Sequence, residues 1–149
     1  MSIFHSMNNS ASALTAHRLR MDVISSNMAN AESTRGKLVN GEWQPYQRKS
    51  VVLEPKDGQF SNFLNKAMNQ SSAGNGVKAT RIIEDETPFK LVYNPEHPDA
   101  NAEGYVELPN VDPLREMVDL ISATRSYEAN VTVLNASKSM LMKALEIGK

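Results

Sequence analysis

The sequence predicts an α+β protein with two long terminal helices paired as a coiled coil and a small β-rich middle region. Apolar side chains recur at three- and four-residue spacing over residues 3–31 and again over residues 111–147. Between these stretches the period changes to short runs separated by Gly, Pro and Asn, which is typical of strands and turns. We expect residues 1–35 and 111–149 to form one helical domain around a middle domain of residues 36–110.

The composition excludes several classes of function. Sixteen Lys and Arg residues stand against 17 Asp and Glu, for a net charge of −1, which argues against a nucleic-acid face or a polybasic membrane anchor. The chain has no cysteine, so it offers no disulfide, thiolate metal site or cysteine nucleophile. No apolar run approaches the roughly eighteen residues of a membrane span. Because the N-terminus lacks the pattern of a cleaved signal peptide, any export needs another route.

Residues 3–31 are expected to form the first helix. Asn and Ser are frequent there and weaken an isolated helix, so packing against other helices must supply the remaining stability. We expect Asn27 and Asn30 to bond their own local backbone at the helix end, and Gly36 to mark a chain reversal. The apolar line of this helix consists of Phe4, Met7, Ala11, Leu14, Met21 and Met28, interrupted by Arg18 and Ser25.

The middle region is expected to consist of short strands. The pair Asn40-Gly41 between apolar runs is a strong hairpin signal. Residues 84–86 are expected to form a solvated acidic turn. The remaining expected elements are a strand at residues 46–53 with Val51, Val52 and Leu53 buried, a short helix at 60–68, a flexible loop at 69–76, and strands at 77–83, 89–93 and 105–108.

The proline-containing loop between the last two strands holds one group of potential metal ligands. His97, Asp99 and Glu103 offer one imidazole and two carboxylates, which could hold a divalent ion. No second histidine is near and no metalloprotease motif occurs, so we favour structural roles. In the structural roles that we favour, Asp99 caps a local turn and His97 forms a hydrogen bond with a backbone carbonyl. We therefore assign no catalytic, metal-binding or cofactor-binding residue and no small-molecule substrate.

The last third of the chain predicts the longest helix. Asp112 is a suitable N-cap, Pro113 fits the first helical position, and Gly148 is a suitable stop. A sustained 3.5-residue period favours a left-handed coiled coil with a partner helix. The line on this helix runs through Met117, Leu120, Tyr127, Val131, Leu134, Leu141 and Leu145, with Thr124 and Lys138 interrupting it.

Three motifs resemble those of one protein family. Asn27-Met-Ala-Asn-Ala31, followed by Thr34, resembles the helix-end motif of flagellar rod and hook proteins, although Ser26 and Met28 depart from it. The stretch from Glu116 to Asn130 is similar to the C-terminal signature of that family. The segment from Tyr93 to Val111 resembles the proximal-rod proteins of the FlgC type in particular.

This resemblance implies a structural subunit of the axial rod, which links the flagellar motor to the hook. It implies passage through the flagellar type III export apparatus in unfolded form, without a cleaved signal. It also implies terminal helices that form an inner tube, in the basal body on the periplasmic side of the inner membrane. The implied partners are other copies of the chain, other rod proteins and the membrane-embedded ring with its adaptor.

Exposed apolar lines on both helices predict that subunits assemble through them. If each subunit contacts the next head-to-tail without closing, the product is a helical tube. We assign the assembly interface to Phe4, Met7, Leu14, Met21, Asn27, Asn30, Met117, Leu120, Tyr127, Val131, Leu134, Leu141 and Leu145.

Three other functions stay open from the sequence. The chain could be another axial protein of the distal rod or hook, although the loop before residue 111 argues against it. It could be a metal-dependent hydrolase that uses His97, Asp99 and Glu103. It could also be a free-standing dimeric coiled-coil adaptor in the cytosol.

Overall fold

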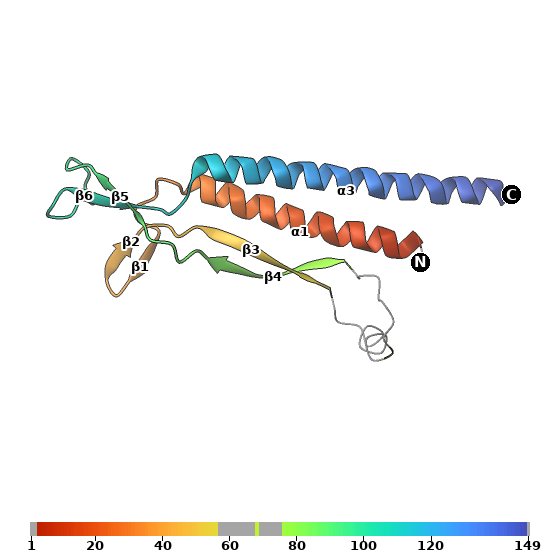
Figure 1. Ribbon diagram of the computed structural model, residues 1–149, viewed down its shortest axis with the longest axis horizontal. Coiled ribbons are helices and arrows are strands. Elements are labelled where there is room, and N and C mark those ends of the chain that lie inside the picture. Colours follow the sequence, from red (N-terminus) through yellow and green to blue (C-terminus); the bar gives the residue numbers. More distant parts are fainter. Residues whose placement is uncertain (1–2, 57–67, 69–75, 149) are drawn as a thin grey trace. The chain divides into compact units, whose positions relative to one another are not determined.

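The computed structural model describes residues 3–56, 68 and 76–148. Two helices and six strands follow one another along the described chain (Figure 1). They are α1 (Ile3–Ala29), β1 (Lys37–Val39), β2 (Glu42–Gln44), β3 (Lys49–Pro55), β4 (Val77–Glu84), β5 (Lys90–Tyr93), β6 (Tyr105–Leu108) and α3 (Pro113–Ile147). Within the described residues, neither helix combines the length and the apolar character that a membrane crossing requires.

The chain divides into two compact units, and both take residues from the terminal helices and from the segment between them. The first unit comprises Met1–Leu19, Val52–Arg81 and Ala123–Lys149, and the second comprises Arg20–Val51 and Ile82–Ser122. The α+β class is confirmed. An independent β-rich domain over residues 36–110 stays a prediction.

The start and end of α3 are those that the sequence predicts. The backbone N–H of Leu114 donates to Asp112 Oδ1 at 3.1 Å, which is the N-cap hydrogen bond, and Pro113 is the first helical residue. At the other end the Gly148 N–H donates to the Ala144 carbonyl at 3.2 Å, one residue past the helix. The helix has 35 residues, about three times the usual length.

Some buried residues of α3 stand one residue before the positions that the sequence predicts to face inward. Leu120, Tyr127, Leu134 and Leu141 are half-buried, but the fully buried positions of the helix are Glu116, Ala123 and Ser137. Together these positions keep the alternating three- and four-residue spacing. Met117 and Leu145 remain exposed in the single chain. The spacing of the inner positions therefore agrees with the sequence prediction. The predicted line lies one residue away from the buried positions in places, because it follows the large apolar side chains.

The helix α1 shows the same shift. Its buried positions are Ser10, Ala16, Val23, Ile24 and Asn27, whereas Met7, Leu14 and Met21 are half-buried. Phe4 is 70% exposed. In the first half of the helix the buried side chains, Ser10 and Ala16, are small, which allows neighbouring backbone to approach closely. In the second unit α1 and α3 are antiparallel, because Arg20 contacts Asp119 while Asn27, further along α1, contacts Glu116, earlier in α3.

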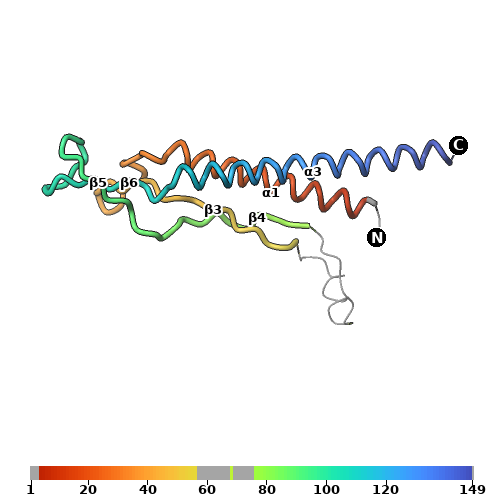
Figure 2. The backbone as a smooth tube through the Cα atoms, turned by 45° about the horizontal axis from the view of Figure 1, so that its top comes forward, coloured from red at the N-terminus to blue at the C-terminus, as the bar shows by residue number. Residues whose placement is uncertain are grey.

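Among the described residues the strands form three pairs, β1 with β2, β3 with β4, and β5 with β6. Figure 2 traces β3 beside β4 as a backbone tube. The Asn40-Gly41 turn between β1 and β2 has φ values of 54° and 90°, as a two-residue type I′ hairpin requires. Leu38 stands opposite Trp43 in that hairpin, and Tyr93 opposite Tyr105 in the β5–β6 pair.

Two expectations for the middle region need correction, and one lies outside the described residues. The strand expected at residues 46–53 is β3, which begins at Lys49, because residues 46–48 are held by polar contacts to the helices instead. Val51, Val52 and Leu53 are half-buried rather than buried, since β3 pairs with a single strand in the described part of the chain. The helix expected at 60–68 and most of the loop at 69–76 lie outside the described residues.

Gly36 allows two backbone segments to touch. Its φ is not in the left-handed region, so the glycine is required here for space and not for an unusual backbone conformation. A Cβ at this position would lie 2.6 Å from both Cα and N of Tyr46, closer than real contacts permit. The close approach is fixed by hydrogen bonds from Gly36 N–H to the Gln44 carbonyl (2.8 Å) and from Tyr46 N–H to the Ser33 carbonyl (3.1 Å).

We predict that Gly36→Ala lowers the free energy of unfolding by about 1–3 kcal/mol, because the added methyl group forces the two backbone segments apart. Denaturant unfolding of the purified chain measures this. Gly148→Ala is the matched control, since its Cβ would come no closer than 3.6 Å to the surrounding backbone. Equal unfolding midpoints for the two variants would contradict the close packing at Gly36.

Candidate functional site

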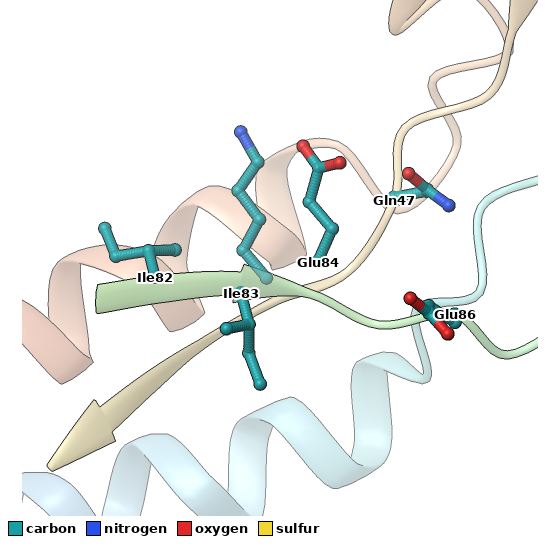
Figure 3. Close-up of a pocket in the computed structure, with 6 residues that line it drawn as sticks. Gln47, Ile82, Ile83, Glu84 and Glu86 are labelled. Carbon is teal, nitrogen blue, oxygen red and sulfur yellow. The ribbon is translucent and has the colours of Figure 1, made fainter. Parts of the chain in front are cut away.

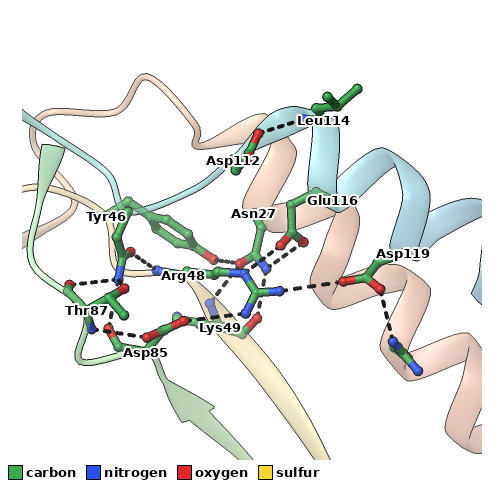
Figure 4. A network of polar contacts seen from close by, with 12 residues as sticks. Asn27, Tyr46, Arg48, Lys49, Asp85, Thr87, Asp112, Leu114, Glu116 and Asp119 are labelled. Carbon is green, nitrogen blue, oxygen red and sulfur yellow. Dashed lines mark hydrogen bonds and ion pairs between the residues drawn. The ribbon is translucent and has the colours of Figure 1, made fainter.

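The side chain of Asn27, near the end of α1, is 1% exposed and uses its full hydrogen-bonding capacity (Figure 4). Its Oδ1 accepts from the Lys49 N–H at 2.9 Å and from the Tyr46 hydroxyl at 3.0 Å. Its Nδ2 donates to the Lys49 carbonyl at 2.8 Å and to Glu116 Oε2 at 3.1 Å. The amide therefore pairs with the first residue of β3 as a neighbouring strand would. It does not bond its local backbone, contrary to the sequence prediction; Asn30 does, donating to the Ser26 carbonyl at 2.9 Å.

Glu116, in the first turns of α3, has no exposed surface and is paired by Arg48. Arg48 Nε donates to Glu116 Oε1 at 2.6 Å, while Oε2 accepts from Asn27. A buried carboxylate is costly unless it is both paired and hydrogen-bonded, and here both oxygens have partners. The pair joins the segment before β3 to α3, and Asn27 joins α1 to both.

Arg48 is the centre of a cluster of five charged side chains. Its Nη1 lies 3.5 Å from Asp85 Oδ2, and its Nη2 lies 3.7 Å from Asp119 Oδ2. Asp119 also contacts Arg20 of α1 at 3.4 Å. Burial by itself lowers the pKa of Arg48, but the hydrogen bond and charge of Glu116, with the charges of Asp85 and Asp119, raise it by more. Arg48 therefore stays charged.

The main chain of Arg48 is held as firmly as its side chain. Its N–H donates to Asn110 Oδ1 at 2.7 Å, and its carbonyl accepts from the Asp85 N–H at 2.8 Å. Asn110 Nδ2 in turn donates to the carbonyls of Asp85 (2.9 Å) and Thr87 (3.1 Å). Asn110, shortly before α3, thus fixes the segment that enters β3 and the segment that leaves β4.

The acidic turn at residues 84–86 is consequently not simply solvated. Asp85 Oδ1 accepts from the Thr87 N–H at 3.1 Å. That backbone hydrogen bond lowers the pKa of Asp85 most; burial opposes it, and the Thr87 side chain and Arg48 lower the pKa further. The net pKa is below the ordinary value.

A second polar contact uses the loop that carries His97, Asp99 and Glu103. Thr34 Oγ1 donates to Asp99 Oδ2 at 2.8 Å, and Arg35 Nε donates to Asp99 Oδ1 at 2.8 Å. These hydrogen bonds, that of Arg35 before that of Thr34, lower the pKa of Asp99. Asp99 therefore ties the loop to the segment after α1 rather than capping a turn through its carboxylate.

The arrangement of this loop does not support a metal site. His97 Nδ1 accepts from the Asp99 N–H at 3.1 Å, instead of bonding a carbonyl as the sequence suggests. Among the described residues no three His, Cys, Asp or Glu side chains lie where they could hold a metal ion. The hydrolase hypothesis therefore has no constellation of ligands to use in that part of the chain.

The predicted interface residues fall into three groups by burial. Asn27 is buried in the polar cluster, and Phe4, Met117 and Leu145 stay exposed. The half-buried members are Met7, Leu14, Met21, Asn30, Leu120, Tyr127, Val131, Leu134 and Leu141. Sequence reasoning missed Arg48, Glu116 and Asn110. A charged residue at the first position of the inner line of α3 was the available signal for Glu116.

An open groove of about 690 Å³ lies beside the end of β4 in the second unit (Figure 3). Ile82 and Ile83, both largely exposed, line it together with Gln47, Lys49, Glu84 and Glu86. The groove mixes apolar surface with both signs of charge, and its lining contains no nucleophile with an adjacent base.

Comparison with known proteins agrees with a structural role. Residues 7–36 match the family described as flagella basal body rod protein, and residues 102–147 match the C-terminal family of flagellar basal body rod FlgEFG proteins. The chain is 67% identical to the flagellar basal-body rod protein FlgC of Bacillus subtilis (strain 168), with all of both chains covered. It is 44% identical to FlgC of Escherichia coli O6:H1, again over all of both chains, and 43% identical to FlgC of Borreliella burgdorferi, over 99% and 98%.

We predict that Arg48→Met lowers the free energy of unfolding by up to about 3–5 kcal/mol, because it leaves the Glu116 charge buried without its partner. Arg35→Met is the matched control, because its ion pair with Asp99 lies at the surface, where loss of the charge has little effect. Denaturant unfolding of both variants measures the difference. Similar losses from the two variants would contradict the central role of Arg48.

Acid should weaken the fold in part through Asp85. Because the pKa of Asp85 is lowered in the folded state, its contribution is fully present above its ordinary value of 3.8 and is lost as the pH falls through the folded value. We predict that Asp85→Asn reduces the loss of unfolding free energy as the pH falls below about 4. Glu86→Gln is the control, because Glu86 makes no hydrogen bond or ion pair with the described residues. Identical pH profiles for Asp85→Asn and the unmodified chain would refute this.

Proposed function

The chain belongs to the flagellar basal-body rod proteins of the FlgC type and is a structural subunit of the rod, and from this premise we propose that it polymerises through its two terminal helices. The family is structural, and the hydrolase hypothesis is not favoured. A subunit that polymerises in this way needs apolar surface that its own fold leaves exposed.

The observation that carries this proposal is the apolar surface that the helices leave exposed. In the first unit Phe4, Met140, Leu145 and Ile147 are all more than half exposed. In the second unit Leu114, Val118 and Ile121 are exposed as well, at the three- and four-residue spacing of one helix face. Exposed apolar side chains at this spacing indicate an interaction surface. Neighbouring subunits of the rod are the occupants that would cover it.

We propose coiled-coil packing for these helices. The 3.5-residue spacing of buried positions in α3 and the antiparallel contacts Arg20–Asp119 and Asn27–Glu116 support it. Small inward residues such as Ala16 and Ala123 leave the larger Met7, Met21 and Val131 at the border between inner and outer face. Such border residues would contact both the partner helix of the same chain and a helix of the next subunit.

The partners in this proposal are other copies of the chain, other rod proteins, the membrane-embedded ring with its adaptor, and the flagellar type III export apparatus. The subunit would lie in the basal body on the periplasmic side of the inner membrane. Transport in unfolded form agrees with the topology of the polar cluster, which joins residues 27, 48, 85 and 116. That cluster can form only after most of the chain has been released.

We predict that Leu145→Asp abolishes swimming and incorporation into purified hook–basal bodies, because the charge would enter a dry helix contact. Since Leu145 is 74% exposed in the single chain, the unfolding free energy should change by less than about 0.5 kcal/mol. Motility in soft agar and immunoblots of basal bodies measure the first effect, and thermal unfolding measures the second.

Asn135→Asp is the matched control, because it adds the same charge to an exposed position of the same helix that lies off the predicted line. It should swim normally. Normal swimming of Leu145→Asp as well would rule out the proposed interface at that end of α3.

A further inference from the structure

A groove of about 320 Å³ opens in the second unit where β1–β2, the loop after β5 and β6 come together. Aromatic and apolar side chains form one part of its lining, and carboxylates form another. The residues that matter here are Trp43, Pro45, Tyr105, Val106, Asp99 and Glu107. Pockets with aromatic walls and a few polar groups commonly receive a side chain of a binding partner.

The groove is well suited to an arginine side chain. Trp43, the single tryptophan of the chain, is 57% exposed, and Tyr105 is also exposed. Asp99 already accepts from Thr34 and Arg35, whereas the Glu107 carboxylate makes no hydrogen bond or ion pair with the described residues. An aromatic face beside an uncompensated carboxylate favours a guanidinium group, which stacks and pairs at once.

The second unit also carries a surface with the complementary character. In the first two turns of α3, Leu114, Arg115 and Val118 are exposed, and we call them the α3 ridge. Arg115 makes no hydrogen bond or ion pair with any residue that the structure describes. Its neighbours Leu114 and Val118 are more than 60% exposed. The ridge thus presents a cation between two apolar side chains, and this cation forms no ion pair with the residues that the structure describes.

We propose that the α3 ridge of one copy docks in the Trp43–Glu107 groove of a second copy, with Arg115 paired to Glu107 against the aromatic wall. This inference rests on the proposed function, because it names one contact by which the subunit polymerises. Charge complementarity favours a second copy as the occupant, because the groove carries the Glu107 carboxylate and the ridge carries the Arg115 guanidinium. Because the two surfaces differ, the contact is head-to-tail and can repeat along an open helix.

Cysteine cross-linking in cells tests the contact, and the chain has no cysteine of its own. The variant Glu107→Cys/Arg115→Cys is expressed as the sole copy and oxidised, and hook–basal bodies are analysed on non-reducing gels. A ladder of dimers and higher multimers is expected. Each single variant and the pair Glu103→Cys/Arg115→Cys should give monomer only, because Glu103 does not line the groove.

A charge exchange between the two residues provides a second measurement. It tests the docking contact even if the double-cysteine variant fails to assemble. Glu107→Arg and Arg115→Glu should each reduce incorporation about tenfold, and the combined exchange should restore it. Glu103→Arg should leave incorporation unchanged. Rescue by the exchange distinguishes pairing from a structural role of either residue.

The outcomes separate this inference from the function on which it rests. Absence of the unmodified chain from purified basal bodies would remove the proposed function itself. If the unmodified chain is present, two results overturn the docking contact: assembled double-cysteine chains without a ladder, or a failed charge exchange. Cross-linking only to a protein of different mass overturns the second copy as the occupant.

Discussion

The carboxylate of Glu116 has no exposed surface, and the second unit is arranged so that this charge is tolerated. An unpaired charge in such a place is strongly unfavourable, so one oxygen takes Arg48 at 2.6 Å and the other takes the Asn27 amide at 3.1 Å. Each partner is in turn held by further contacts, Asn27 by Lys49 and Arg48 by Asn110. One charge therefore connects the end of α1, the beginning of β3 and the beginning of α3. A buried ion pair of this kind is better evidence for a unique arrangement of segments than for high stability.

Many buried positions of the helices hold small or polar residues, Val23 and Ile24 being larger exceptions, and many large apolar residues stay outside. Ser10, Ala16, Ala123 and Ser137 are buried, while Phe4 and Leu145 are not. A protein that functions as a monomer gains stability by the opposite arrangement, because burial of large apolar side chains removes the most apolar area from water. The distribution is understandable for a subunit of a polymer, where the outer apolar face is buried by the next subunit.

Local rules predicted the local features and failed where a distant partner decides. The turn at Asn40-Gly41 and the cap at Asp112 need only neighbouring residues, and both form as predicted. Local rules assign Asn27 a role at its own helix end, but its partners are 22 and 89 residues away. Periodicity identified half-buried residues such as Leu134 but missed buried neighbours such as Glu116 and Ser137, because an apolar pattern does not include polar side chains. The contact of Thr34 with Asp99 spans 65 residues and no sequence period encodes it.

The phase of α3 follows from the polar cluster and not from its apolar residues. Successive residues of a helix are about 100° apart, so fixing Glu116 inward turns its neighbours Arg115 and Met117 toward the outside. Both are exposed, as this geometry requires. The same rotation brings Leu120 and Ala123, one and two turns later, toward the inside. The buried charge of Glu116 therefore determines which side of α3 is exposed to other subunits. An apolar residue at position 116 would not fix the rotation of the helix in this way, even if it packed well. The polar contacts within the chain and the apolar contacts between subunits are therefore coupled, because the polar cluster determines which apolar residues of α3 are exposed.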